Sequence, residues 1–102
     1  MGIQVYMNSD IKDLERELKR VLMTIAELNK VLGRYKACLS YVTRTKFLAV
    51  MFGDISSDLT EIEIRLQNVV DTIQAKINEY NKKKEKLMEE IKKVKREHEE
   101  TT

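Results

Sequence analysis

The stretch AVMFGDISSDL (residues 49–59) holds the only reversal of direction that this sequence predicts. It contains Gly53, one of three glycines in a chain of 102 residues without proline. Glycine reaches positive φ easily and commonly ends helices. Ser56, Ser57 and Asp58 supply side-chain oxygens suited to the start of a helix. The stretch therefore predicts a turn at about 53–56 with a helix on either side.

The residues before this turn carry a seven-residue apolar repeat, whose stripe we call the seam. Alternating spacings of three and four residues place its members on one side of an α-helix that can pack against another helix. Asn8, Ser9 and Asp10 have side chains that cap helix starts. We therefore expect the first helix over about 10–52. Its seam consists of Ile11, Leu14, Leu18, Val21, Ile25, Leu28, Leu32, Tyr35, Leu39 and Val42.

The repeat resumes after Asp58 and predicts a second helix over about 57–100. Two helices of matched length with a short link predict an all-α fold, a long antiparallel hairpin of coiled-coil type, in a single domain spanning 1–102. The polar interruptions of the second seam are Glu63, Lys84 and His98. Its apolar members are Leu59, Leu66, Val70, Ile73, Ile77, Tyr80, Leu87, Ile91 and Val94.

The charge pattern predicts how the two helices are aligned. Folding back at the turn places residues opposite each other when their numbers add up to about 109. Unlike charges then meet, and such pairs select register more than they stabilise a fold. The expected contacts include Glu15 and Glu17 with the basic segment 92–96, Glu27 with Lys82, and Lys46 with Glu63.

One part of the chain also fits a different fold. SYVTRTKFLAVMF (residues 40–52) is rich in residues that favour strands, and Lys46 interrupts the seam there. IQVYM (residues 3–7) has the same character. The alternative is an α+β fold with short strands near 3–7 and 42–50.

Apolar residues beside the seam predict association with other helices. A lone two-helix hairpin has no inner layer, whereas a wider apolar stripe is what a bundle requires. We expect dimerisation into a four-helix bundle or docking on a helical protein partner, and Cys38 to be a small buried hydrophobe. The predicted interaction residues are Leu22, Met23, Val31, Ile62, Ile64 and Val69 beside the seam, with Met51 and Phe52 at the turn, where capping of the core is the simpler role.

A net charge of +2, from 19 basic and 17 acidic residues, does not indicate a polycation. One interval of the first helix nevertheless has no acidic residue between Leu28 and Gly53, which keeps nucleic-acid binding by a helical dimer as an alternative. Its possible contacts are Lys30, Arg34, Lys36, Arg44 and Lys46. We expect these charges to form a solvated face instead.

No phosphate-binding loop, nucleophile elbow or metal-binding box occurs in the sequence. We therefore expect no catalytic residue, cofactor, metal or small-molecule substrate. His98 is the only histidine, and the single cysteine excludes an internal disulfide. No apolar run approaches the roughly 20 residues of a membrane span, and MGIQVYMNSD does not have the pattern of a signal peptide. We expect a cytoplasmic chain that does not enter membranes.

In layout the chain resembles the WXG100 class of small secreted helical hairpins. The class carries Trp-X-Gly at its bend, where this chain has Met51, Phe52 and Gly53. Its tail tyrosine precedes an acidic residue by four positions, where Tyr80 here precedes Lys84. The resemblance implies an exported hairpin protein as a second alternative. The reading we favour is a non-enzymatic protein–protein interaction module, a coiled-coil adaptor or scaffold acting through homo- or hetero-oligomeric helix packing.

Overall fold

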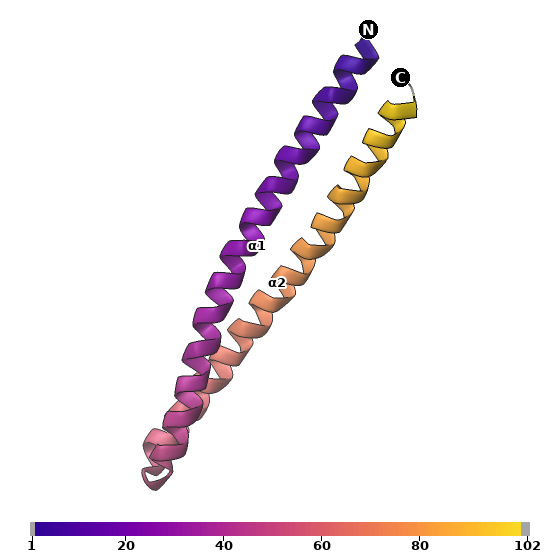
Figure 1. Ribbon diagram of the computed structural model, residues 1–102. Coiled ribbons are helices and arrows are strands. Elements are labelled where there is room, and N and C mark those ends of the chain that lie inside the picture. Colours follow the sequence, from indigo (N-terminus) through magenta and orange to yellow (C-terminus); the bar gives the residue numbers. More distant parts are fainter. Residues whose placement is uncertain (1, 101–102) are drawn as a thin grey trace. The chain divides into compact units, whose positions relative to one another are not determined.

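The computed structural model describes the backbone of residues 2–100 and the side chains of residues 10–97 and 99. Helix α1 spans Gly2–Leu48, a short 3-10 helix η1 spans Ala49–Met51, and helix α2 spans Gly53–Glu100 (Figure 1). No strand occurs among the described residues. The predicted all-α helical hairpin is therefore confirmed, and the α+β alternative with strands near 3–7 and 42–50 is wrong.

Residues 42–48 are helical although their threonines favour strands, because hydrogen bonds within α1 and across to α2 satisfy these side chains. The Thr45 hydroxyl donates to the carbonyl oxygen of Tyr41 at 2.8 Å, and the Thr43 hydroxyl donates to Glu63 at 2.9 Å. Leu39 and Val42 continue the seam and are half-buried. Packing of the seam outweighs intrinsic strand preference here.

The helix bounds differ from those expected. Helix α1 begins at Gly2 rather than near residue 10, so Asp10 lies inside a helix and caps nothing. The helical repeat of the seam begins at Ile11, but the segment before it continues the same helix. Helix α2 begins at Gly53, about four residues earlier than expected, and the amide of Ser56 donates to the carbonyl of Phe52 at 3.0 Å.

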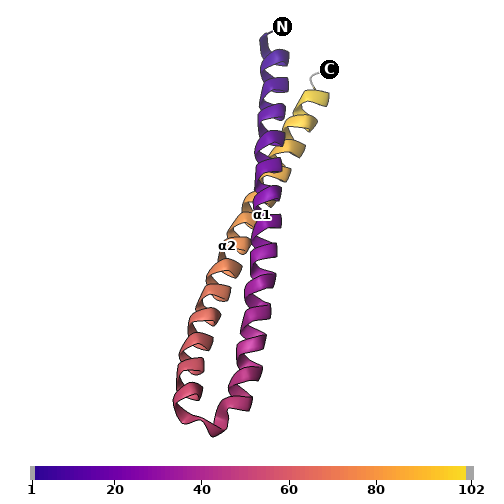
Figure 2. The ribbon, with the colours of Figure 1, turned by 90° about the vertical axis from the view of Figure 1, so that its left-hand side faces the viewer.

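The chain reverses between α1 and α2 (Figure 2). Phe52, between η1 and α2, leaves the helical conformation there, with φ −119° and ψ 86°. Its amide donates to the carbonyl of Ala49 at 2.9 Å, which closes η1. No described glycine has a positive φ. The expectation that Gly53 turns the chain through a left-handed conformation is therefore wrong, because the tightened last turn and one extended residue already redirect it.

The chain forms two compact units, which are described separately. Unit 1 comprises Met1–Ala26 and Asn78–Thr102, and unit 2 comprises Glu27–Ile77 with the bend. In unit 1, Val21, Leu87 and Ile91 are buried. Ion pairs that join its helices include Glu17–Lys83 at 3.1 Å and Glu15–Lys95 at 3.6 Å.

Unit 2 has a core made of seam residues from both helices. Its buried cluster consists of Leu32, Val70 and Ile77, against which Leu28, Leu39 and Ile73 pack. Across the described side chains of both units, Tyr35 is the only predicted seam residue that is exposed, at 38%. The seam is thereby confirmed, except at His98, which lies outside the described side chains.

Candidate interaction surface

A second stripe runs along α2 beside the seam in unit 2. It repeats the spacing of three and four residues that packs helices together. Its apolar members remain accessible, with Ile55 52%, Ile62 45% and Val69 38% exposed. This stripe, called the α2 stripe below, consists of Ile55, Asp58, Ile62, Arg65 and Val69.

A corresponding stripe occupies α1. Tyr41 is 68% exposed and Leu48 82% exposed, and Cys38 is a free, exposed thiol. Toward Val31 the surface is hollowed into an open groove of about 460 Å³, lined by Val31, Arg34, Tyr35 and Cys38. This stripe, called the α1 stripe below, consists of Val31, Arg34, Cys38, Tyr41, Thr45 and Leu48.

The two stripes lie on the same side of the helix pair. In an antiparallel pair, residues that directly precede seam positions fall on one side on both helices, and residues that directly follow them fall on the other. Unit 1 shows this rule directly. Glu17 and Lys83, which pair at 3.1 Å, both precede seam positions. Glu15 and Lys95, which pair at 3.6 Å, both follow them.

In unit 2, Val31, Cys38, Ile62 and Val69 all directly precede seam residues. The α1 and α2 stripes therefore make one continuous surface, which we call the apolar face. The opposite side has a different composition. Residues that follow seam positions there are mixed: Asn29, Lys36 and Thr43 on α1 and Thr60, Gln67 and Gln74 on α2 are polar, whereas Phe47 and Ile64 are exposed and apolar.

The predicted interaction residues divide between this face and other surfaces. Val31, Ile62 and Val69 lie on it. Leu22, 47% exposed, and Met23, 61% exposed, belong to unit 1, and Leu22 follows rather than precedes a seam residue. Ile64 is 56% exposed and is rotated by roughly 200° from Ile62, on the other side of α2. The eight residues therefore do not form one site.

The expected burial of Cys38 is wrong, since its side chain is exposed. It directly precedes Leu39, whose seam position is only half-buried. A position beside the seam is covered only if a further helix packs there. The cysteine therefore lies on the accessible side of α1.

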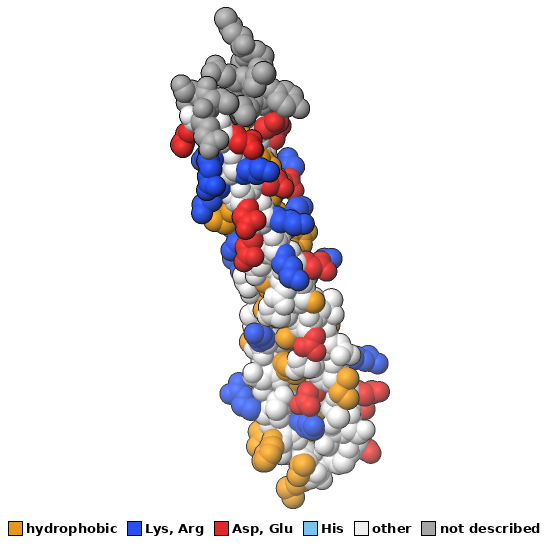
Figure 3. Space-filling model, turned by 90° about the vertical axis from the view of Figure 1, so that its right-hand side faces the viewer, with side chains coloured by type: hydrophobic (Ala, Val, Ile, Leu, Met, Phe, Trp, Pro, Cys, Tyr) orange, Lys and Arg blue, Asp and Glu red, His pale blue; other side chains and the backbone are white. Residues whose placement is uncertain are grey.

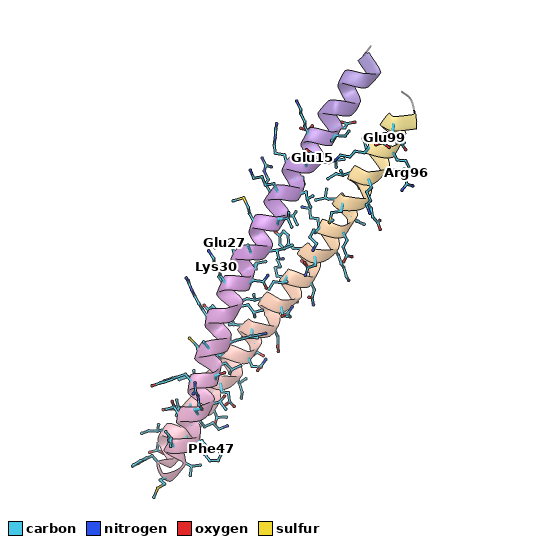
Figure 4. All side chains as sticks on the ribbon, in the orientation of Figure 1. Glu15, Glu27, Lys30, Phe47, Arg96 and Glu99 are labelled. Atoms are coloured by element: carbon cyan, nitrogen blue, oxygen red, sulfur yellow. The ribbon has the colours of Figure 1, made fainter. Side chains whose placement is uncertain are left out.

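The bend carries the most exposed apolar side chains of the described chain. Met51 is 87% and Phe52 64% exposed, so these residues do not cap the core. Phe47, at 85%, and Val50, at 70%, are also exposed, and sequence reasoning assigned them no site. Hydrophobic side chains gather at this end in Figure 3, and Figure 4 shows the Phe47 ring directed away from both helices. The run FLAVMF (47–52) was the available signal, because an unbroken apolar run cannot turn every side chain inward.

The basic residues of α1 do not form one stripe. Lys30 pairs with Glu27 at 3.7 Å, on the side of α1 away from α2 (Figure 4). Lys46 pairs with Glu63 at 3.4 Å, in the seam. The Arg44 Nε donates to the carbonyl of Ser40 at 3.5 Å.

Arg34 lies on the apolar face. Lys36 directly follows the seam residue Tyr35 and therefore lies on the opposite side of the helix pair. The possible nucleic-acid contacts are thus spread around the helix. A groove that tracks a phosphate backbone needs its cations aligned.

Other site types receive little support from the geometry. A second open depression, about 560 Å³, is lined by Leu39, Ser40, Thr43 and Arg44. In the described part of the chain, no three His, Cys, Asp or Glu side chains are grouped as metal ligands would be. Neither α1 nor α2, over its described residues, has the apolar stretch that crossing a bilayer takes. Comparison with protein-family models, curated proteins and solved structures found no match.

Proposed function

We propose that this chain is a non-enzymatic protein–protein interaction module whose apolar face receives the helices of a partner. The observation that carries the proposal is the pair of adjacent stripes in unit 2. Ile62, Val69, Tyr41 and Leu48 lie there between 38% and 82% exposed, in the spacing of three and four residues that packs helices together. Contiguous exposed apolar surface of this kind marks interaction sites.

The composition of the face supports a protein as the occupant. Interfaces are enriched in tyrosine and arginine around an apolar centre. Tyr35, Tyr41, Arg34 and Arg65 lie on or beside the face. The spacing of three and four residues matches a helix rather than an extended peptide. The partner is thus a helical surface, which makes the chain an adaptor or scaffold.

The internal core supports the same conclusion. Six hydrophobic side chains are buried among the described residues, and none of the described side chains is less than 2% exposed. Small cores of this kind are commonly completed by oligomerisation. Covering the apolar face would add a layer on the accessible side of unit 2. The exposed thiol of Cys38 suits a reducing compartment, and we place the module in the cytoplasm.

The test compares matched serine substitutions on and off the apolar face. Ile62→Ser with Val69→Ser removes apolar area from the face, and Leu22→Ser with Met23→Ser removes apolar area from exposed positions elsewhere. Molar mass is measured by sedimentation equilibrium and the unfolding midpoint by circular dichroism, both over a range of chain concentrations.

We expect the wild-type midpoint to rise with concentration, because binding stabilises the folded state. The face variant should lose this dependence and the control variant should keep it. A folded wild-type monomer with a concentration-independent midpoint, matched by the face variant, would overturn the proposed function.

A further inference from the structure

We infer that the partner of the apolar face is a second copy of this chain, with the two α2 helices packed antiparallel about a twofold axis at Ile62. The inference rests on the proposed function and specifies its occupant. It depends on the order of residues in the α2 stripe, on two charges that have no partner among the described side chains, and on the alignment of α1 with α2.

The α2 stripe is self-complementary when reversed. Its residues read Ile55, Asp58, Ile62, Arg65 and Val69. A twofold axis at Ile62 places that residue against its own copy and Ile55 against Val69 of the second copy. Asp58 then faces Arg65 of the second copy, on both sides of the axis. Isologous interfaces have this property, since each contact occurs twice.

Asp58 and Arg65 have no ion pair or side-chain hydrogen bond among the described residues. They stand seven residues apart, roughly 10 Å along the helix, beyond the three- or four-residue spacing at which side chains pair within one helix. Two unlike charges within an apolar stripe therefore lack partners among the described residues of the chain. A parallel, in-register pairing of two α2 helices would bring Asp58 against Asp58, which is unfavourable.

Helix α1 is compatible with the same axis. Lys46 and Glu63, whose numbers add up to 109, contact each other across the pair at 3.4 Å. By this alignment, an axis at Ile62 on α2 falls at about residue 47 on α1. Tyr41 then lies opposite Phe52 of the second copy, and Thr45 opposite Leu48. No charged residues are brought together on this side.

The size of the surface is appropriate for a reversible dimer. The covered apolar side chains are Tyr41, Leu48, Phe52, Ile55, Ile62 and Val69, which are 38% to 82% exposed. Their exposed fractions correspond to roughly 600 Å² per copy, below the ~800 Å² per partner of standard specific complexes. The interface is thus at the small end of the range of specific complexes, where reversible association is common.

Charge reversal tests the geometry. The Asp58→Arg variant would place two positive charges at each contact between residues 58 and 65. The Arg65→Asp variant would place two negative charges there. Each variant alone should dissociate at least tenfold more readily. Mixed in equal amounts, the two variants should form a heterodimer near wild-type affinity, because every 58–65 contact again joins opposite charges. Asp71→Arg, on the far side of α2, should leave the dimer unchanged.

A cross-linking experiment tests the axis by a different readout. Ile62→Cys in a Cys38→Ser background should form a disulfide-linked dimer under copper phenanthroline and oxygen, which oxidise two thiols to one disulfide. Ile64→Cys in the same background is the matched control and should remain unlinked. The twofold arrangement would be overturned if Ile64→Cys cross-linked as fast as Ile62→Cys.

The two proposals fail in distinguishable ways. Association that responds to serine at Ile62 and Val69, but shows no recovery on mixing the charge variants, overturns the twofold arrangement and leaves the interaction module standing. Association or midpoints that do not respond to serine on the face overturn the proposed function itself.

Discussion

In unit 2 the Nζ atom of Lys46 lies 3.4 Å from Oε1 of Glu63, with both side chains in seam positions. The Thr43 hydroxyl donates to Oε2 of the same glutamate at 2.9 Å. A polar layer thus replaces an apolar one in the part of the hairpin near the bend. The side chains are 35% and 26% exposed, so water still reaches the pair.

We expect the double variant Lys46→Leu, Glu63→Leu to be more stable than the wild type. Two facing leucines would extend the apolar seam, and hydrophobic packing there contributes more than the ion pair does. Lys46→Leu alone should be less stable than the double variant, since it leaves Glu63 without its cation. The unfolding midpoint by circular dichroism at fixed concentration is the measurement. A double variant that melts below the wild type would show that the polar layer also sets the alignment.

Acidification should weaken this layer. The Thr43 hydrogen bond, aided by the Lys46 ammonium against some opposing burial, lowers the pKa of Glu63 below its ordinary value of 4.5. A carboxyl whose folded pKa is depressed stabilises the fold above its unfolded pKa, and this contribution is lost as pH falls through the folded pKa. The loss should therefore occur below about pH 4.5.

The measurement is the difference in unfolding midpoint between wild type and Glu63→Gln from pH 7 to pH 2.5. The wild-type advantage should shrink toward the acid end. Thr43→Val removes the hydrogen bond that is the largest cause of the lowered Glu63 pKa. The titration of the Glu63 side chain, followed by NMR, should then move toward the ordinary pKa of 4.5. A titration unchanged by Thr43→Val would contradict the assignment.

Alanine should be tolerated at two glycines. Neither Gly33 nor Gly53 has an atom within 4 Å of an added Cβ, and neither has positive φ. Inside a helix, alanine is more favourable than glycine by about 1 kcal/mol. Gly33→Ala should therefore raise the free energy of unfolding by about that amount, and Gly53→Ala, at the first residue of α2, by a smaller amount. Urea titration measures both, and a loss of stability at Gly53 would mean that the bend requires glycine.

The core should respond much more than the surface to truncation. Ile77 is 4% exposed and belongs to the cluster with Leu32 and Val70. Ile77→Ala should reduce the free energy of unfolding by about 2–5 kcal/mol, through lost burial and the cavity left behind. Met23→Ala, at a position 61% exposed, should change it by less than about 0.5 kcal/mol. Similar effects for the two variants in urea titrations would refute the assigned core.

Part of the charge alignment was predictable and part was not. Glu15–Lys95 and Lys46–Glu63 form as expected. Glu27 instead pairs with Lys30 on its own helix, and Lys83 rather than a residue of 92–96 meets Glu17. Long charged side chains reach several neighbours, so charge pattern predicts the alignment of two helices better than it predicts individual partners.

The sequence by itself determined the two helices and the seam, because a repeat of three and four residues has one inward stripe whatever surrounds it. Only the tertiary structure decided where α1 begins, that Phe52 rather than Gly53 turns the chain, and that Cys38, Met51 and Phe52 are exposed. The reason is physical. An apolar repeat shows which side of a helix faces inward on average. The position of a bend, and the burial of a residue beside the seam, depend on where a second helix lies.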